Sequence, residues 1–299
     1  MPALSRKAGR RTTLKPANRR EAEQELKKAD QHGVRLVASC EDEYPKALFQ
    51  IPDAPPILYV RGHVSLFEKP SIAIIGARNA SGIGRKIARS LAADLGRANI
   101  VVTSGLARGI DAAAHQGSIN SGTIAVLAGG ADVIYPRENT EIYHKIKETG
   151  LILSEMPFGT QPQARHFPRR NRIISGLALG VLVVEATHKS GTLITARLAS
   201  EQGREVFAIP GSPLDPRSKG PNTLIKQGAQ LTESVEDILD VLSLMSGRSI
   251  SEPQADLFTS GSYLEEKNSD IEKATIKIKE KLSHTAVSID ELIRLTELS

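Results

Sequence analysis

The chain has 299 residues, of which 40% are hydrophobic and 24% charged, and its formal net charge is +5. This length allows one large domain with an ample core and one or two small ones. No stretch of about eighteen apolar residues is present, which argues against a membrane-spanning helix. The basic N-terminus also lacks the apolar core of a secretory signal. The single cysteine, Cys40, excludes an internal disulfide and a cysteine-rich zinc site, so we expect no metal and a reducing, cytoplasmic setting.

The first seventy residues divide into two parts. Residues 1–20 hold seven Lys and Arg side chains and no acid, which is typical of a disordered arm that any polyanion could attract. Residues 21–70 read as short helices broken by prolines. They predict a small helical (SAM-like) domain.

Strand and helix patterns alternate from Ser71 onward. Short apolar runs predict strands at 71–75, 99–105, 123–128, 151–155, 180–186 and 205–211. Helical periodicity intervenes at 84–96, 110–118, 138–147, 171–179, 192–201 and 222–227. Buried strands that alternate with helices predict an α/β fold with a Rossmann-like, doubly wound, mainly parallel sheet over residues 71–244. In such a sheet the ligand crevice lies beyond the carboxyl ends of the strands.

The C-terminal part has a different pattern. A helix at 235–244 is followed by a polar linker at 245–270 and by two amphipathic segments at 271–299. The second segment begins with a capping box, Ser288 followed by Glu291. Because the chain ends where a third helix is expected, residues 271–299 predict the start of a truncated winged-helix domain.

The first strand runs into the loop GARNASGIG at 76–84. Glycines at a strand-to-helix turn let backbone N–H groups face an anion, and Arg78 favours a phosphate over a purely structural tight turn. The glycine spacing does not match G-x-G-x-x-G, and no Walker A motif occurs. The second strand ends at Thr103 and Ser104, where a dinucleotide-binding protein carries an acid. We therefore expect a phosphate loop without a nucleotide cofactor.

The second loop is SGLARGID at 104–111. Gly105 permits a tight turn, and Arg108 can grip a phosphate with its forked guanidinium. Asp111 and His115 are spaced i, i+4, so they can pair. Without a nucleophile or metal partner, that pair predicts a structural hydrogen bond rather than a general base.

The segment HFPRRNR at 166–172 is the most informative. Arginines at a helix start can neutralise phosphates, and Phe167 can stack on a base, as single-strand binding requires. The alternative places Phe167 in the core and the arginines in salt bridges, but no acid lies within the run. A further anion nest is predicted at Ser190–Thr195, where backbone N–H groups and hydroxyls begin a helix.

Six strings in order resemble the DprA/Smf family (DNA-processing protein A): SGLARGIDAAAH, GGADVIYPRENTEIY, SEMPFG, HFPRRNRIISGL, VVEATHKSGTLITA and PGSPLDPRSKGPNTLIKQGA. The resemblance implies a cytoplasmic protein of natural transformation that binds incoming single-stranded DNA, protects it and loads the RecA recombinase. It also implies a homodimer without catalytic activity. The residues that would line the DNA groove are Arg78, Ser104, Gly105, Arg108, Arg165, His166, Phe167, Arg169, Arg170, Asn171, Arg172, Ser190, Gly191, Thr192 and Thr195.

The alternative is a nucleotide-binding enzyme on the same fold, similar to the lysine-decarboxylase-like nucleoside-monophosphate phosphoribohydrolases. Those enzymes carry a hydrolytic glutamate in a P-G-G-x-G-T-x-x-E stretch. The comparable stretch here, EATHKSGTLITA at 185–196, keeps the Ser-Gly-Thr nest and has Leu193–Ala196 in place of the acid. Phosphate binding without that carboxylate favours the DNA-binding interpretation.

Overall fold

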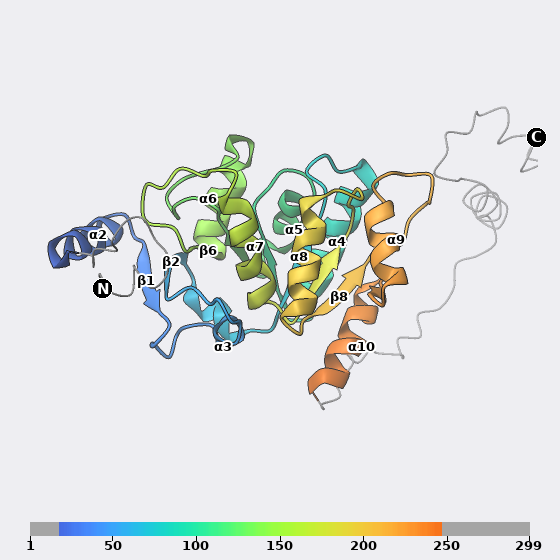
Figure 1. The fold of residues 1–299 in the computed structure, drawn as a ribbon, viewed down its shortest axis with the longest axis horizontal. Coiled ribbons are helices and arrows are strands. Elements are labelled where there is room, and N and C mark those ends of the chain that lie inside the picture. The colour runs from blue at the N-terminus through green and yellow to red at the C-terminus, as the bar shows by residue number, and fades with distance from the viewer. Residues whose placement is uncertain (1–17, 247–299) are drawn as a thin grey trace, which may run out of the picture. The chain divides into compact units, whose positions relative to one another are not determined.

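The computed structural model describes residues 18–246, whose strands form a nine-stranded sheet. Figure 1 shows the fold. The order across the sheet is β1-β2-β6-β5-β4-β3-β7-β8-β9. The pairs β1–β2 and β2–β6 are antiparallel, and every other neighbouring pair is parallel. The strands are β1 (Arg35–Ala38), β2 (Ile57–Gly62), β3 (Ser71–Ile75), β4 (Val101–Ser104), β5 (Thr123–Val126), β6 (Leu151–Ser154), β7 (Gly180–Val183), β8 (Glu205–Ala208) and β9 (Gln230–Leu231).

Helices cover both faces of this sheet. The α-helices are α2 (Arg19–Gln31), α3 (Lys46–Phe49), α4 (Gly82–Arg97), α5 (Ile110–Ser118), α6 (Thr140–Thr149), α7 (His166–Leu177), α8 (Gly191–Glu201), α9 (Lys219–Lys226) and α10 (Val235–Ser246). Two 3-10 turns, η1 (Val64–Glu68) and η2 (Arg137–Asn139), complete the list. The α/β, Rossmann-like, doubly wound and mainly parallel fold class is therefore confirmed.

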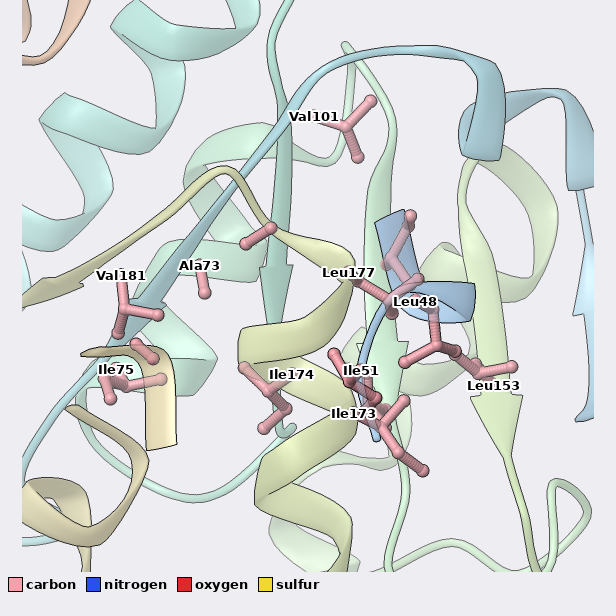
Figure 2. Close-up of a cluster of buried hydrophobic side chains, with 14 of the residues drawn as sticks. Leu48, Ile51, Ala73, Ile75, Val101, Leu153, Ile173, Ile174, Leu177 and Val181 are labelled. Atoms are coloured by element: carbon pink, nitrogen blue, oxygen red, sulfur yellow. The ribbon is translucent and has the colours of Figure 1, made fainter. Parts of the chain in front are cut away.

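Alternating side chains of the central strands pack into two hydrophobic cores, one on each face of the sheet. In β3, Ala73 and Ile75 pack in the cluster that α3, α7 and α8 cover, while Ile72 and Ile74 pack in the cluster beneath α4, α5 and α10. Figure 2 shows the first cluster, where the α7 side chains around Ile174 meet those of α3 and of the sheet. Strands buried on both faces read as continuous apolar runs, which is why the sequence reveals them.

The chain reverses its direction across the sheet at β3. Strands β4, β5 and β6 follow one another on one side of β3, and β7 then returns to its other side. Right-handed crossovers accordingly place α4, α5 and α6 on one face and α7 and α8 on the opposite face. The loops after β3 and β7 diverge at this switch point and leave a crevice beyond the strand ends.

The expectation of a separate helical domain at 21–70 is wrong. Strands β1 and β2 lie in this segment, and β2 pairs with β6, so the segment extends the main sheet. Leu58 and Val60 alternate into the α3–α7 core. Pro52, Pro55 and Pro56 lie in the turn before β2, and Pro45 is the N-cap of α3. Strand β9, which the sequence did not predict, adds two residues at the other edge.

The basic arm, the linker and the winged-helix segment (residues 1–17 and 247–299) lie outside the described residues, so those expectations remain predictions. Within residues 18–246, no helix is both long and apolar enough to cross a membrane.

Candidate functional site

Two adjoining clefts open at the carboxyl ends of the parallel strands. The first has a volume of about 630 Å³ and lies at the switch point, where the loops after β3 and β7 meet the start of α7 and the loop after β8. The second, of about 540 Å³, lies over the loops after β4 and β5. Both volumes fall within the range of small-molecule sites. The clefts share Arg78, Ala107 and Phe167, so these residues form the ridge between them.

The ridge carries a cation over an aromatic ring. The Arg78 guanidinium carbon lies 5.1 Å from the centre of the half-buried Phe167 ring. Tyr135, from the loop after β5, places its own ring centre 5.8 Å from that of Phe167. The alternative that placed Phe167 in the core is wrong, because this residue lines both clefts.

Beneath the ridge lies a buried guanidinium. Arg170 Nη1 donates to the carbonyl oxygen of Gly105 at 2.7 Å and to that of Val126, and Nε donates to Asn171 Oδ1 at 3.3 Å. The Arg170 side chain therefore joins α7 to the ends of β4 and β5. A side chain at position 105 would collide with this guanidinium, which explains the glycine there.

Asp111 is the buried counter-charge. Its Oδ2 accepts hydrogen bonds from the backbone N–H groups of Gly105 at 3.1 Å and Ala107 at 3.4 Å, so it holds the loop that carries Arg108. Burial raises the pKa of Asp111, while Arg170 and these N–H groups oppose the rise. Burial likewise lowers the pKa of Arg170 to about 10, and Asp111 opposes that fall.

The predicted Asp111–His115 pair does not form. The His115 ring lies inside the core with Nδ1 2.9 Å from Thr123 Oγ1, and the Thr123 hydroxyl donates to the carbonyl oxygen of Val102 at 2.6 Å. Because that hydroxyl proton is already committed, Nδ1–H of His115 is the donor. Burial lowers the pKa of His115 to about 3, so the ring is neutral and braces β4 and β5.

The arginine run at the start of α7 divides into exposed and buried members. Arg165 is exposed, and Arg169 is exposed but pairs with Glu155 at 2.9 Å. Arg172 is buried and pairs with Glu155 at 2.6 Å and with Asp53 at 3.0 Å. The salt-bridge alternative is therefore right for Arg169 and Arg172: the loop after β6 brings Glu155 back onto α7.

Three other expected groove residues are internal. Ser104 is buried and donates to the carbonyl oxygen of Ile74 at 2.6 Å, so it joins β4 to β3 and lines neither cleft. Gly105 borders the second cleft, but its N–H and carbonyl groups are taken by Asp111 and Arg170. His166 is buried and its Nδ1 accepts from the Gln163 N–H at 3.3 Å. A sequence pattern shows the strand end but not which backbone groups are already bonded.

The start of α8 lies in the first cleft as expected. Ser190 is the N-cap and accepts from the Thr192 N–H at 3.2 Å, and the Thr192 hydroxyl donates to the Gly76 carbonyl oxygen at 3.1 Å. These bonds tie the loop after β7 to the loop after β3. Gly191 is exposed at the helix start, and Thr195 is a buried residue of the cleft wall.

Sequence reasoning missed several residues of this site. Glu185 accepts from the Ser81 N–H at 2.9 Å and from its hydroxyl at 2.5 Å, which fixes the loop after β3. Asp215 and Arg217 pair at 3.4 Å in the wall of the first cleft. Tyr135 has 49% of its surface exposed, and the string VIYPREN offered a signal, an aromatic residue two positions before an arginine. No His, Cys, Asp and Glu side chains gather into a potential metal site within residues 18–246.

Comparison with known proteins decides the family. The model of the family described as DNA recombination-mediator protein A matches residues 35–243, from the first residue of β1 to within α10. The chain belongs to this family. The matched range agrees with the fold, because it includes β1 and β2, which belong to the same sheet as the parallel strands.

Relatives within the family are similar over 71–75% of the chain. DNA processing protein DprA of Bacillus subtilis (strain 168) is 45% identical over 215 residues, which are 71% of this chain and 72% of the relative. Protein Smf of Escherichia coli (strain K12) is 43% identical over 227 residues, 75% of this chain and 61% of that protein.

Solved structures of the family have the same fold. DNA processing protein A from Streptococcus pneumoniae has a TM-score of 0.70 at 41% identity, over 75% of this chain and 78% of that one. DNA processing protein A from Helicobacter pylori, whose structure is described for its single-stranded DNA binding mode, has a TM-score of 0.65 at 29% identity over 72% of this chain and 98% of that one.

Proposed function

We propose that this family member binds single-stranded DNA across the two clefts through its phosphates and bases. The observation that carries the proposal is the ridge, where Arg78 lies over the half-buried Phe167 ring and both side chains line both clefts. A cation for a phosphate beside a ring for a base is the combination that binds single strands without reading their sequence.

The charge of the clefts supports a polyanionic ligand. Arg78, Arg108 and Arg137 line the second cleft against one acid, Glu138, which is 3.6 Å from Arg108. In the first cleft the acids Asp111 and Asp215 already have partners within the protein. Among residues 18–246, Arg78 and Arg137 line the clefts without an ion pair, whereas each acid of the lining has a partner.

The similarity to relatives extends the proposal. The Helicobacter pylori protein is described as binding single-stranded DNA, and the family is described as recombination mediators. We infer that this protein protects incoming DNA in the cytoplasm during natural transformation, that it loads RecA onto the strand, and that it acts as a homodimer. Gel shifts that compare single-stranded with duplex DNA at two salt concentrations test the binding itself; a preference for duplex would overturn it.

We further propose that binding occurs without catalysis. The hydrolytic acid of the phosphoribohydrolases has no counterpart in Leu193–Ala196. Glu185, the one acid within the comparable stretch at 185–196, accepts hydrogen bonds from the hydroxyl and N–H groups of Ser81. Release of free base from purine monophosphates would contradict this part of the proposal.

Changing Arg78 to alanine should flatten the salt dependence of binding. If about four to six phosphates are neutralised, log affinity should fall with log salt at a slope of roughly −3 to −4, and each lost contact should remove about 0.7 from it. Arg97→Ala is the matched control, because Arg97 is an exposed arginine at the far end of α4 that pairs with Asp94. Fluorescence anisotropy across a salt series measures both slopes, and equal slopes would remove Arg78 from the interface.

Changing Phe167 to alanine should weaken single-strand binding by about 1–3 kcal/mol, the range measured for a base stacked on an aromatic ring. The salt slope should stay near that of the unchanged protein, because no charge is removed. Phe167→Tyr keeps the ring and should retain most of the affinity. Undiminished binding by the alanine variant would show that no base stacks at this position.

A further inference from the structure

The second cleft contains an exposed aromatic side chain that the proposed phosphate contacts do not explain. Tyr135 has 49% of its surface exposed, although tyrosine normally buries most of its ring. Its ring lies beside Phe167 at the ridge, and Val133, Ile134 and Pro136 give the cleft an apolar lining. A half-exposed ring at the edge of an apolar, basic cleft offers a stacking surface.

The geometry of the two rings shows how they can be used. The Tyr135 and Phe167 ring planes are inclined at 59°, with their centres 5.8 Å apart. One base inserted between two rings needs them parallel and ~7 Å apart, twice the van der Waals contact distance. The two rings therefore cannot hold one base between them. Each can take a separate base on its own face.

Cations line the cleft that holds this pair of rings. Arg78 lies over Phe167, and Arg108 and Arg137 line the second cleft together with Tyr135. Arg108 has a side-chain exposure of 62% and pairs with the equally exposed Glu138, so solvent screens that pair. Arg78 and Phe167 line both clefts, so the cationic and aromatic lining is continuous from one cleft into the next.

We propose that the second cleft is a separate nucleotide subsite in which Tyr135 stacks a base and Arg108 and Arg137 hold the adjoining phosphate. The DNA strand crosses the ridge, so that neighbouring or near-neighbouring bases lie on Phe167 and on Tyr135. This inference rests on the proposed single-strand binding and adds a second base contact to it.

A ladder of oligothymidylates that lengthens one nucleotide at a time tests the subsite. Affinity of the unchanged protein should rise in a step when the strand becomes long enough to enter the second cleft. Tyr135→Ala should abolish that step, weakening long strands roughly 5- to 150-fold while leaving the shortest binding strands unchanged. Tyr135→Phe, which keeps the ring, should keep the step. Unchanged thermal melting shows that the variants are folded.

Several outcomes would overturn the proposal. Equal weakening at every length would show that Tyr135 acts only by orienting Phe167, and no weakening at all would show that no base stacks on it. Photocrosslinking with one 5-iodouracil placed at each position in turn adds a direct readout: Tyr135 and Phe167 should be labelled from different positions, and labelling from the same position alone contradicts two subsites. If the unchanged protein binds no oligothymidylate, the proposed function itself fails, which is a distinct result.

Discussion

Replacing Arg170 with alanine is expected to lower the free energy of unfolding by about 3–5 kcal/mol, as when one partner of a buried ion pair is removed. The guanidinium bonds to the carbonyl oxygens of Gly105 and Val126 and is the counter-charge of buried Asp111. Its removal takes the donor from both carbonyl oxygens and the counter-charge from Asp111, which is 6% exposed. Urea denaturation measures the change.

The control lies in the same arginine run. Arg165 is exposed at the N-cap of α7, and its change to alanine should alter stability by no more than about 0.5 kcal/mol. A double variant, Arg170→Met with Asp111→Asn, should recover part of the lost stability because it removes the uncompensated charge. If Arg170→Ala is as stable as the unchanged protein and only flattens the salt slope, Arg170 contacts DNA directly.

The pH dependence gives a second check on the Arg170 variant. Burial raises the pKa of Asp111 above its ordinary value of 3.8, and Arg170 limits that rise. Without Arg170 the folded state retains the Asp111 proton to a higher pH than the unfolded state does. Stability falls with rising pH wherever the folded state binds more protons. The loss of stability in Arg170→Ala should therefore shrink as the pH is lowered from neutrality toward 3.8, and a loss that grows instead would contradict the assignment.

Replacing Glu155 with alanine is expected to cost about 3 kcal/mol of stability, the lower end of the range for a broken buried pair. The Glu155 side chain is 6% exposed and pairs with Arg172, which is 9% exposed. Asp53 stays 3.0 Å from Arg172 in the variant, so the guanidinium keeps one partner. Chemical denaturation measures the loss.

A double-mutant cycle separates the contribution of the buried Glu155–Arg172 pair from that of the more exposed Glu155–Arg169 pair. Glu155→Ala combined with Arg172→Ala should show a coupling energy of about 0.5–3 kcal/mol, as for residues in direct contact. Arg169 also pairs with Glu155, but its side chain is 63% exposed, so Arg169→Ala should cost only about 0–1 kcal/mol. Additive effects at Glu155 and Arg172 would show that the pair contributes nothing measurable.

The parallel part of the fold was predictable from the sequence because buried strands and amphipathic helices carry local patterns. Strands β3 to β8 were each predicted from such a run. Strands β1 and β2 were not, because the prolines around them read as helix breaks and their antiparallel pairing with β6 is a long-range contact. The loops of the site were also predictable, since the carboxyl ends of parallel strands meet at one edge.

The roles of the arginines were not predictable in the same way. Arg78 and Arg108 remain candidates for DNA contact because they are exposed in the clefts. Arg170 and Arg172 are buried among groups far away in sequence or on a returning loop. Arg170 and Arg172 are two residues apart and so point to different sides of α7. Helical spacing alone does not show that the fold buries both sides.

Local sequence patterns thus determined the strand order along the chain, the phosphate-type loops and the basic start of α7. Only the tertiary structure decided that Glu155 and Asp111 neutralise part of that basic run and that Tyr135 lies beside Phe167. The physical reason is that strand and helix patterns reflect neighbours within one or two turns. Burial and charge pairing instead depend on residues that the fold brings together from separate strand ends.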